Sequence, residues 1–191
     1  LGEPVVSIHR EGGGVRIATA RGAERYDAVV IATHSDQALA MLADPSPAEA
    51  SVLSAVGYRD NRVLLHRDQS LMPRRRHAWA AWNYLRDSRD DGSSDVAVTY
   101  WMNKLQGIDA NTPLFVSLNP PREPKPGTLF GEYSYAHPQF DAAALAAQRA
   151  LPALQGVRNT WFAGAWTGYG FHEDGLKSGL AAAEQLGAVI P

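Results

Sequence analysis

Cysteine is absent from the 191-residue chain, which excludes disulfides, thiolate metal ligands and a cysteine nucleophile. A chain without disulfides suits a reducing compartment, so we expect a cytoplasmic protein. No apolar run approaches the roughly 20 residues that a spanning helix needs, and no basic, apolar leader precedes the first strand-like segment. We therefore expect a soluble globule with no transmembrane segment.

An excess of charge of one sign is also lacking, because 18 Lys and Arg stand against 20 Asp and Glu. Binders of nucleic acid or anionic membranes usually carry a strong positive balance, so the sequence favours neither partner. The densest basic run is Arg74-Arg75-Arg76. It has two interpretations, a clamp for a carboxylate or phosphate and a solvated loop, of which we favour the loop.

Several catalytic signatures are missing as well. The six histidines show neither His-x-x-x-His nor Glu-x-x-His spacing, so we predict no metal site. No Gly-x-Ser-x-Gly elbow of a serine hydrolase occurs. The Gly-x-Gly-x-x-Gly turn that binds a dinucleotide pyrophosphate is absent too, since Gly12-Gly13-Gly14 leads into a strand and not a helix.

The apolar pattern predicts α/β structure at both ends of the chain and an α+β fold overall. Residues 5–8 and 15–19 indicate a hairpin, and residues 26–33 a strand buried on both faces of a partly parallel sheet. Helices are expected from Ser35 or Asp36 and over residues 48–56. Asp141 is expected to cap a helix over residues 142–151, followed by a strand at 159–163 and a helix at 175–186.

The middle of the chain has a different sequence pattern, in which strand-like runs predominate. Five β-type runs, at residues 62–66, 79–85, 96–100, 114–118 and 128–134, predict an antiparallel sheet with polar or proline-rich connections. Alternation places Trp82 and Tyr84 on one strand face, and Tyr133 and Tyr135 on another. These aromatics either line an apolar substrate cavity or simply pack a core.

The most informative stretch runs from Trp161 to Ala183 and reads as strand, glycine turn and helix. A strand that ends in Gly164 lets a ligand approach the backbone, and the N-terminus of the following helix offers unpaired N–H groups to electron-rich oxygens. Gly175 and Gly179 lie four residues apart on one helix face, which allows close packing. A plain strand–turn–helix joint is the alternative.

This stretch resembles the C-terminal flavin-binding segment of the flavin-containing amine oxidase superfamily. The resemblance implies FAD as the cofactor. We hypothesise that His172, as a catalytic group, and the adjacent backbone stabilise charge that develops on the reduced flavin, as a helix N-terminus would. One departure is that many members have an acidic residue near the position of Trp166. The implied flavin contacts at this end of the chain are Gly164, Ala165, Trp166, Gly170, Phe171, His172 and Glu173.

A second resemblance covers residues 3–8 and 26–33, where the backbone of Val5 corresponds to an adenine contact and Ala32 and Thr33 lie near the dinucleotide. It implies the C-terminal part of an FAD/NAD(P)-binding, Rossmann-like domain with an inserted substrate domain. The expected domains are residues 1–50 and 157–191 for FAD and residues 51–156 for substrate. The sequence of residues 59–84 is similar to that of a subgroup of NAD/FAD-binding oxidoreductases associated with cyclopropane fatty acid synthases.

The resemblance thus implies a fragment of an FAD-dependent oxidoreductase, a flavoprotein that oxidises a C–N or C–C bond of a small-molecule or lipid substrate. Its partner would be the missing N-terminal part of the same polypeptide, without which we expect an inactive fragment. The competing hypothesis is a non-catalytic ligand-binding or interaction module on a degenerate amine-oxidase scaffold.

Overall fold

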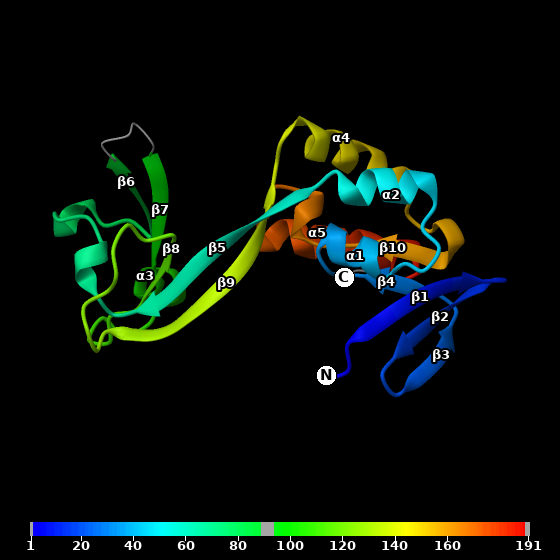
Figure 1. Cartoon of the computed structure of the whole chain (residues 1–191), viewed down its shortest axis with the longest axis horizontal. Helices are drawn as coiled ribbons and strands as arrows, with labels where there is room; N and C mark the ends of the chain where they lie inside the picture. The colour runs from blue at the N-terminus through cyan, green and yellow to red at the C-terminus, as the bar shows by residue number, and fades with distance from the viewer. Residues whose placement is uncertain (1, 89–93, 190–191) are drawn as a thin grey trace. The chain divides into compact units, whose positions relative to one another are not determined.

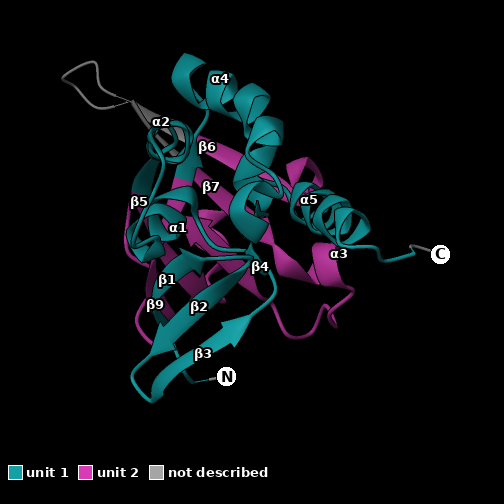
Figure 2. Cartoon of the chain, turned by 90° about the vertical axis from the view of Figure 1, so that its right-hand side faces the viewer, with its two compact units in different colours: residues 1–59, 138–191 teal, residues 60–137 magenta. Residues whose placement is uncertain are grey.

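The chain forms two compact units in a computed structural model that describes residues 2–88 and 94–189. Unit 1 comprises Leu1–Arg59 and Pro138–Pro191, and unit 2 comprises Asp60–His137 (Figure 2). Unit 2 thus covers residues 60–137, whereas the expected substrate domain covers residues 51–156.

Unit 1 opens with a three-stranded antiparallel sheet in the order β1-β2-β3, formed by β1 (Val5–Glu11), β2 (Gly14–Thr19) and β3 (Gly22–Tyr26) (Figure 1). The predicted hairpin is confirmed, and Gly13 makes its turn with φ of 86°, which favours glycine. Tyr26 ends β3 opposite Val15 and does not open the next strand as predicted.

A parallel pair of short strands forms the second sheet of unit 1. β4 (Val29–Ile31) pairs with β10 (Thr160–Phe162), so the predicted parallel element is confirmed across 130 residues of sequence. Burial on both faces was wrong for β4, because Ile31 is buried whereas Val30 is 39% exposed. Alternation turns Ile31 into the core and Val30 to the other side of a sheet of two strands.

Four helices complete unit 1: α1 (Ser35–Met41), α2 (Pro47–Ser54), α4 (Ala142–Ala150) and α5 (His172–Gln185). The cap predicted at Asp141 is confirmed, since its Oδ1 accepts a hydrogen bond of 2.9 Å from the N–H of Ala144. Pro47 starts α2 and does not end the preceding helix, because its missing N–H costs nothing at a first helical position. Helices α1, α2 and α4 share one core with β1, β4 and β10, formed by Ile8, Ile31, Ala38, Leu42, Val52, Leu53, Val56, Ala144, Ala147, Leu151, Leu154, Phe162 and Trp166.

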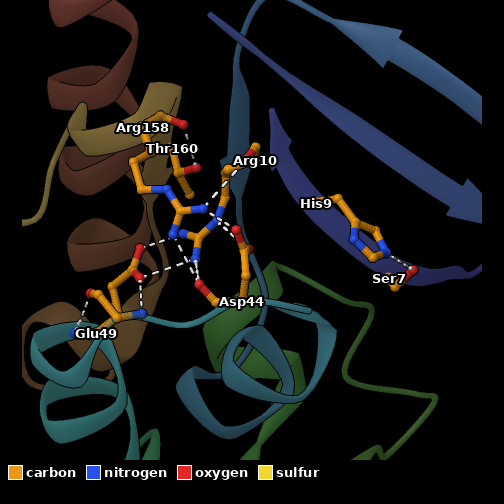
Figure 3. A network of polar contacts seen from close by, with 8 residues as sticks. Ser7, His9, Arg10, Asp44, Glu49, Arg158 and Thr160 are labelled. Carbon is orange, nitrogen blue, oxygen red and sulfur yellow. Dashed lines mark hydrogen bonds and ion pairs between the residues drawn. The ribbon is translucent and has the colours of Figure 1, made fainter. Parts of the chain in front are cut away.

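A buried ionic network ties β1 to α2 (Figure 3). The Arg10 guanidinium binds both carboxylate oxygens of Glu49, and its Nε donates to Asp44 Oδ1 at 2.9 Å. The side chains of Arg10 and Glu49 are only 1% and 2% exposed. Arg158, which precedes β10, also binds the Asp44 carboxylate, so the network joins segments from both ends of the chain.

Unit 2 is built on a five-stranded sheet in the order β6-β7-β8-β5-β9, with the antiparallel pairing that the sequence predicts. Its strands are β5 (Gly57–His66), β6 (Trp82–Ser88), β7 (Ser94–Trp101), β8 (Phe115–Leu118) and β9 (Leu129–Gln139). One short helix that the sequence did not predict, α3 (Met102–Gln106), follows β7. Short 3-10 turns lie at Gln69–Leu71, Arg76–Ala78, Leu151–Ala153, Val157–Asn159 and Ala165–Thr167.

One face of this sheet carries a buried row of hydrogen-bonded polar side chains. His66 Nδ1 accepts from the Asp68 N–H at 3.1 Å, so its proton lies on Nε2 and points to Ser117 Oγ at 2.8 Å. Ser117 Oγ in turn lies 2.7 Å from Thr99 Oγ1. Burial lowers the pKa of His66, and the opposing charge of Asp68 only partly offsets that effect. The histidine is therefore a neutral structural group.

Candidate functional site

The strand end at Gly164 is built so that only glycine fits. The Ala163 N–H donates to the Ile31 carbonyl at 3.0 Å, which continues the β4–β10 pairing up to the turn. Gly164 then adopts φ of 146°, and a Cβ there would lie 2.9 Å from the Trp166 indole nitrogen. Any other residue would have to displace that indole.

Trp166 is held inside this turn. Its side chain is 2% exposed, and its Nε1 donates to the Thr33 carbonyl at 3.0 Å. Its own carbonyl accepts from Gln148 Nε2 at 2.9 Å. The ring thus joins the ends of β4 and β10, bringing together two segments that the sequence proposed as dinucleotide contacts.

Helix α5 begins at His172, three residues before the start that the sequence predicted. Asp174 explains the earlier start, because its Oδ2 accepts 3.0 Å hydrogen bonds from the N–H groups of Tyr169 and Phe171. This carboxylate satisfies the loop and the first turn together. His172 and Glu173 therefore lie in the first turn of the helix and not in the loop before it.

The exposed N-terminus of α5 retains hydrogen-bonding capacity. The first N–H groups of a helix have no acceptor within it, and the described part of the chain supplies none for His172 or Glu173. Gly170, with φ of 88°, and the exposed Phe171 ring lie directly before them. This turn fits a group that offers electron-rich oxygens and a planar ring, as a flavin does.

The two glycines on α5 face different surroundings. A Cβ at Gly175 would meet the backbone nitrogen of Ala165 at 3.7 Å, an ordinary van der Waals contact, so the helix lies against the turn without needing a glycine there. A Cβ at Gly179 would meet nothing within 4 Å. Packing among the described residues therefore requires a glycine at neither position, and the helix face at Gly179 is open.

Val5 lies on β1, an edge strand, beside a hollow of about 460 Å³ on the three-stranded sheet. Two carboxylates, Glu3 and Glu24, line the hollow. Glu3 binds Thr19 Oγ1 at 2.6 Å, and Glu24 binds the Tyr26 hydroxyl at 2.6 Å. Arg21 also lines the hollow and pairs with Glu3 at 3.5 Å, so two carboxylates stand against one cation and the hollow does not attract a pyrophosphate.

In unit 2, the sheet face opposite His66 has an apolar surface. Cross-strand partners share a face, and the register carries that face from β6 through β7 and β8 to β5. We call it the open face: Val63, Leu65, Trp82, Tyr84, Val98, Tyr100, Val116 and Leu118. All but Val63 are at least partly exposed, and none is charged.

The structure separates the two aromatic pairs that were proposed as substrate contacts. Trp82 and Tyr84 are exposed on β6, with the Trp82 ring 5.5 Å from that of Tyr100. Tyr133 and Tyr135 stack on each other, at 5.9 Å, on β9 at the opposite edge. Four strand spacings, or about 19 Å, separate β6 from β9, so the two aromatic pairs cannot both contact the same small group of a substrate.

Three further residues position the turn and the start of α5, and none of them was predicted from the sequence. Ser178 Oγ accepts from the Gly164 N–H at 2.9 Å, Gln148 binds the carbonyls of Trp166 and Gly168, and Asp174 holds the loop. Only Asp174 has a sequence signal, since an acidic residue three positions after a cap is typical of helix starts. Asn83, on the other face of β6 from Trp82 and Tyr84, is buried and donates to the Ala80 and Thr99 carbonyls.

Within the described ranges, no three His, Asp or Glu side chains come together as metal ligands would. No helix in those ranges is long and apolar enough to cross a membrane.

Residues 1–67 match the family of flavin-containing amine oxidoreductases. The matched region includes β1 to β4, α1 and α2, and therefore the Val5 and Thr33 segments. A search of curated proteins finds no significant match.

Solved structures extend the likeness over the whole chain at the level of fold. A CLA-producing fatty acid isomerase from P. acnes matches 97% of the chain with a TM-score of 0.66 and 15% identity. Cyclohexylamine oxidase from Brevibacterium oxydans IH-35A matches 97% with a TM-score of 0.61 and 15% identity, and a reduced UDP-galactopyranose mutase matches 100% with 0.61 and 12%. The chain spans 48%, 49% and 48% of these three proteins.

Proposed function

We propose that the chain forms part of a cytoplasmic, FAD-dependent oxidoreductase of the amine oxidase type. Unit 1 would be the C-terminal part of its Rossmann-like FAD-binding domain, and unit 2 its substrate domain. The observation that carries the proposal is the glycine turn at Gly164, which leads into the open N-terminus of α5. The family match at residues 1–67 supports the same cofactor from the other end of the chain.

Backbone groups would do most of the cofactor binding. The N–H groups of His172 and Glu173 would meet flavin oxygens, and Gly170 and Phe171 would lie along the ring. Gly164 and Ala165 would contact the rest of the cofactor through their backbone, as would Trp166, whose side chain is buried, and Val5 would meet the adenine. Bound FAD would accept a hydride equivalent from a C–N or C–C bond, which the protein orients and shields from water.

His172 is proposed as the group that stabilises negative charge on the reduced cofactor. It is exposed at the first position of α5, where the helix dipole favours negative charge. In the longer protein, His172→Ala should lower both the flavin reduction potential and turnover. Glu184→Gln, an exposed polar change near the other end of α5, is the control and should leave the potential unchanged, and an unchanged potential in His172→Ala would remove this role.

The open face supports an apolar substrate, a lipid included, in keeping with the resemblance to proteins associated with cyclopropane fatty acid synthases. Its eight residues carry no charge that could recognise an ammonium or carboxylate group. Trp82→Ala should therefore raise KM more than it lowers kcat. Leu105→Ala, an equally exposed apolar change on α3, is the control and should leave KM unchanged.

The deciding experiment is visible absorbance of the longer gene product. A purified product with bound flavin supports the enzyme, and Gly164→Val in that product should abolish the absorbance. We expect the 191-residue chain alone to bind added FAD weakly or not at all, because it lacks a pyrophosphate-binding glycine turn. A longer product that is folded, colourless and unable to take up FAD would favour the non-catalytic module.

A further inference from the structure

Positive charge gathers in one part of unit 2 although the chain as a whole carries a net charge of −2. The segment from Arg67 to Arg76 holds four exposed arginines, and the loop before β9 adds two exposed cations. We call these residues the basic strip: Arg67, Arg74, Arg75, Arg76, Arg122 and Lys125.

Hydrogen bonds hold the two parts of the strip together. The guanidinium of Arg122 donates to the Ser70 carbonyl. The backbone N–H of Lys125 donates to Asp68 Oδ2 at 2.8 Å. Arg67 Nη2 donates to the Gly127 carbonyl at 3.1 Å, so the loop lies against residues 67–70 along its length.

The strip is not neutralised by its surroundings. Among the described residues, none of its six side chains forms an ion pair with a carboxylate. The nearest acids are otherwise engaged: Asp68 is buried and binds Ser70 and the Lys125 N–H, and Glu123 pairs with Arg62. The strip therefore presents six positive charges around the buried Asp68, and the one exposed carboxylate in its loop, Glu123, is already paired with Arg62.

Large apolar side chains lie at the same place. Leu129 and Phe130, the first residues of β9, are 43% and 56% exposed. The Arg67 guanidinium lies 5.9 Å from the centre of the Phe130 ring, and the Arg67 N–H donates to the Thr128 carbonyl at 2.9 Å. At the other end of the strip, Arg76 lies 4.3 Å from the centre of the half-buried Trp79 ring.

We propose that the basic strip binds the surface of an anionic phospholipid bilayer, with Leu129 and Phe130 entering the interface between headgroups and acyl chains. Unpaired cations next to exposed bulky apolar residues are what such a surface selects. A nucleic acid would use the cations but would gain little from an exposed Leu129, so the bilayer is the better fit. This binding goes beyond the proposed oxidoreductase and does not depend on a bound flavin.

Sedimentation with vesicles tests the proposal on the 191-residue chain. The chain should co-sediment with vesicles of equal parts phosphatidylglycerol and phosphatidylcholine, and not with phosphatidylcholine alone. Arg74→Gln/Arg75→Gln should weaken binding roughly 25-fold, at about fivefold for each cation. The side chains of these two arginines form no hydrogen bond or ion pair within the described ranges, and the one backbone bond, from the Ala78 N–H to the Arg75 carbonyl, survives the change, so the fold should be unaffected.

The matched control is Arg21→Gln/Arg149→Gln, which makes the same change in net charge in unit 1 and should change binding less than about twofold. Phe130→Ser should weaken binding while leaving its salt dependence in place. The proposal is overturned if phosphatidylglycerol vesicles do not bind the chain, or if the control weakens binding as much as Arg74→Gln/Arg75→Gln. Binding to duplex DNA as tight as to the vesicles would overturn it as well, in favour of a general polyanion site.

Discussion

Replacing Arg10 by methionine should destabilise unit 1 by about 3–5 kcal/mol, the usual cost of removing one partner of a buried ion pair. In the folded protein, Glu49 would keep the Ser46 N–H at 2.7 Å but would lose both guanidinium hydrogen bonds. With its side chain 2% exposed, water cannot replace them. Methionine fills most of the arginine volume, so the loss reflects charge and hydrogen bonding more than a cavity.

Urea unfolding monitored by tryptophan fluorescence measures the change, with Trp161 and Trp166 reporting on unit 1. The informative comparison is Arg10→Met/Glu49→Gln. Its glutamine can still accept from Ser46 but leaves no buried charge. This double variant should be more stable than Arg10→Met alone by at least about 1 kcal/mol. If Arg10→Met costs less than about 1 kcal/mol, or if the double variant is simply additive, the network is not a coupled buried pair.

The same network predicts that the free energy of unfolding falls at acid pH. Burial alone would raise the pKa of Glu49, but hydrogen bonds from Arg10 and Ser46 outweigh it and hold that pKa below its ordinary value. As pH falls, the unfolded chain therefore binds its proton first. The stabilisation is complete above the ordinary glutamate pKa of about 4.3 and is lost as pH falls below it. Glu49→Gln should reduce this loss of unfolding free energy at low pH.

Three further outcomes follow from individual contacts. Burial lowers the pKa of His66, so the stability of unit 2 should fall as pH drops below about 6.5, and His66→Gln should reduce that dependence in urea titrations at two pH values. Gly164→Ala should cost about 1–3 kcal/mol, because its Cβ would lie 2.9 Å from the Trp166 indole; a melting temperature equal to that of the wild type would refute the steric argument. Asp141→Ala should cost about 1 kcal/mol through loss of the cap on the Ala144 N–H, whereas Asp141→Asn should retain most of the stability in the same melt.

Features specified by neighbouring residues were predictable from the sequence. The β1–β2 hairpin follows from alternating apolar residues on either side of glycines, and the start of α4 follows from the Asp141 cap. The antiparallel sheet of unit 2 was likewise visible as five runs with turn-forming connections. In each case the information lies within about ten residues of the element.

Features decided by distant contacts were not predictable. Tyr26 begins the strand predicted at residues 26–33, yet in the structure it ends β3, because it pairs with Val15 on β2. The hydrogen-bonded row through His66 depends on Ser117, 51 residues away, and no local sequence pattern predicts that contact. Trp79 was assigned to a strand, but it lies before β6 and donates to the Pro73 carbonyl at 2.7 Å. Its apolar character indicated burial without indicating the backbone conformation.

The candidate site combines both cases, and Trp166 illustrates why. The sequence placed this residue among the cofactor contacts, where many members of the resembling family have an acidic side chain. In the structure the indole faces inward to the Thr33 carbonyl and blocks a Cβ at Gly164. A buried ring that fixes two strand ends can position a backbone without touching a ligand. Trp166→Phe therefore separates the two roles: it keeps the apolar ring but removes the N–H that binds Thr33. If the turn acts through its backbone, this variant should loosen the turn and weaken flavin retention in the longer protein, while the absorbance spectrum of the flavin that remains is unchanged.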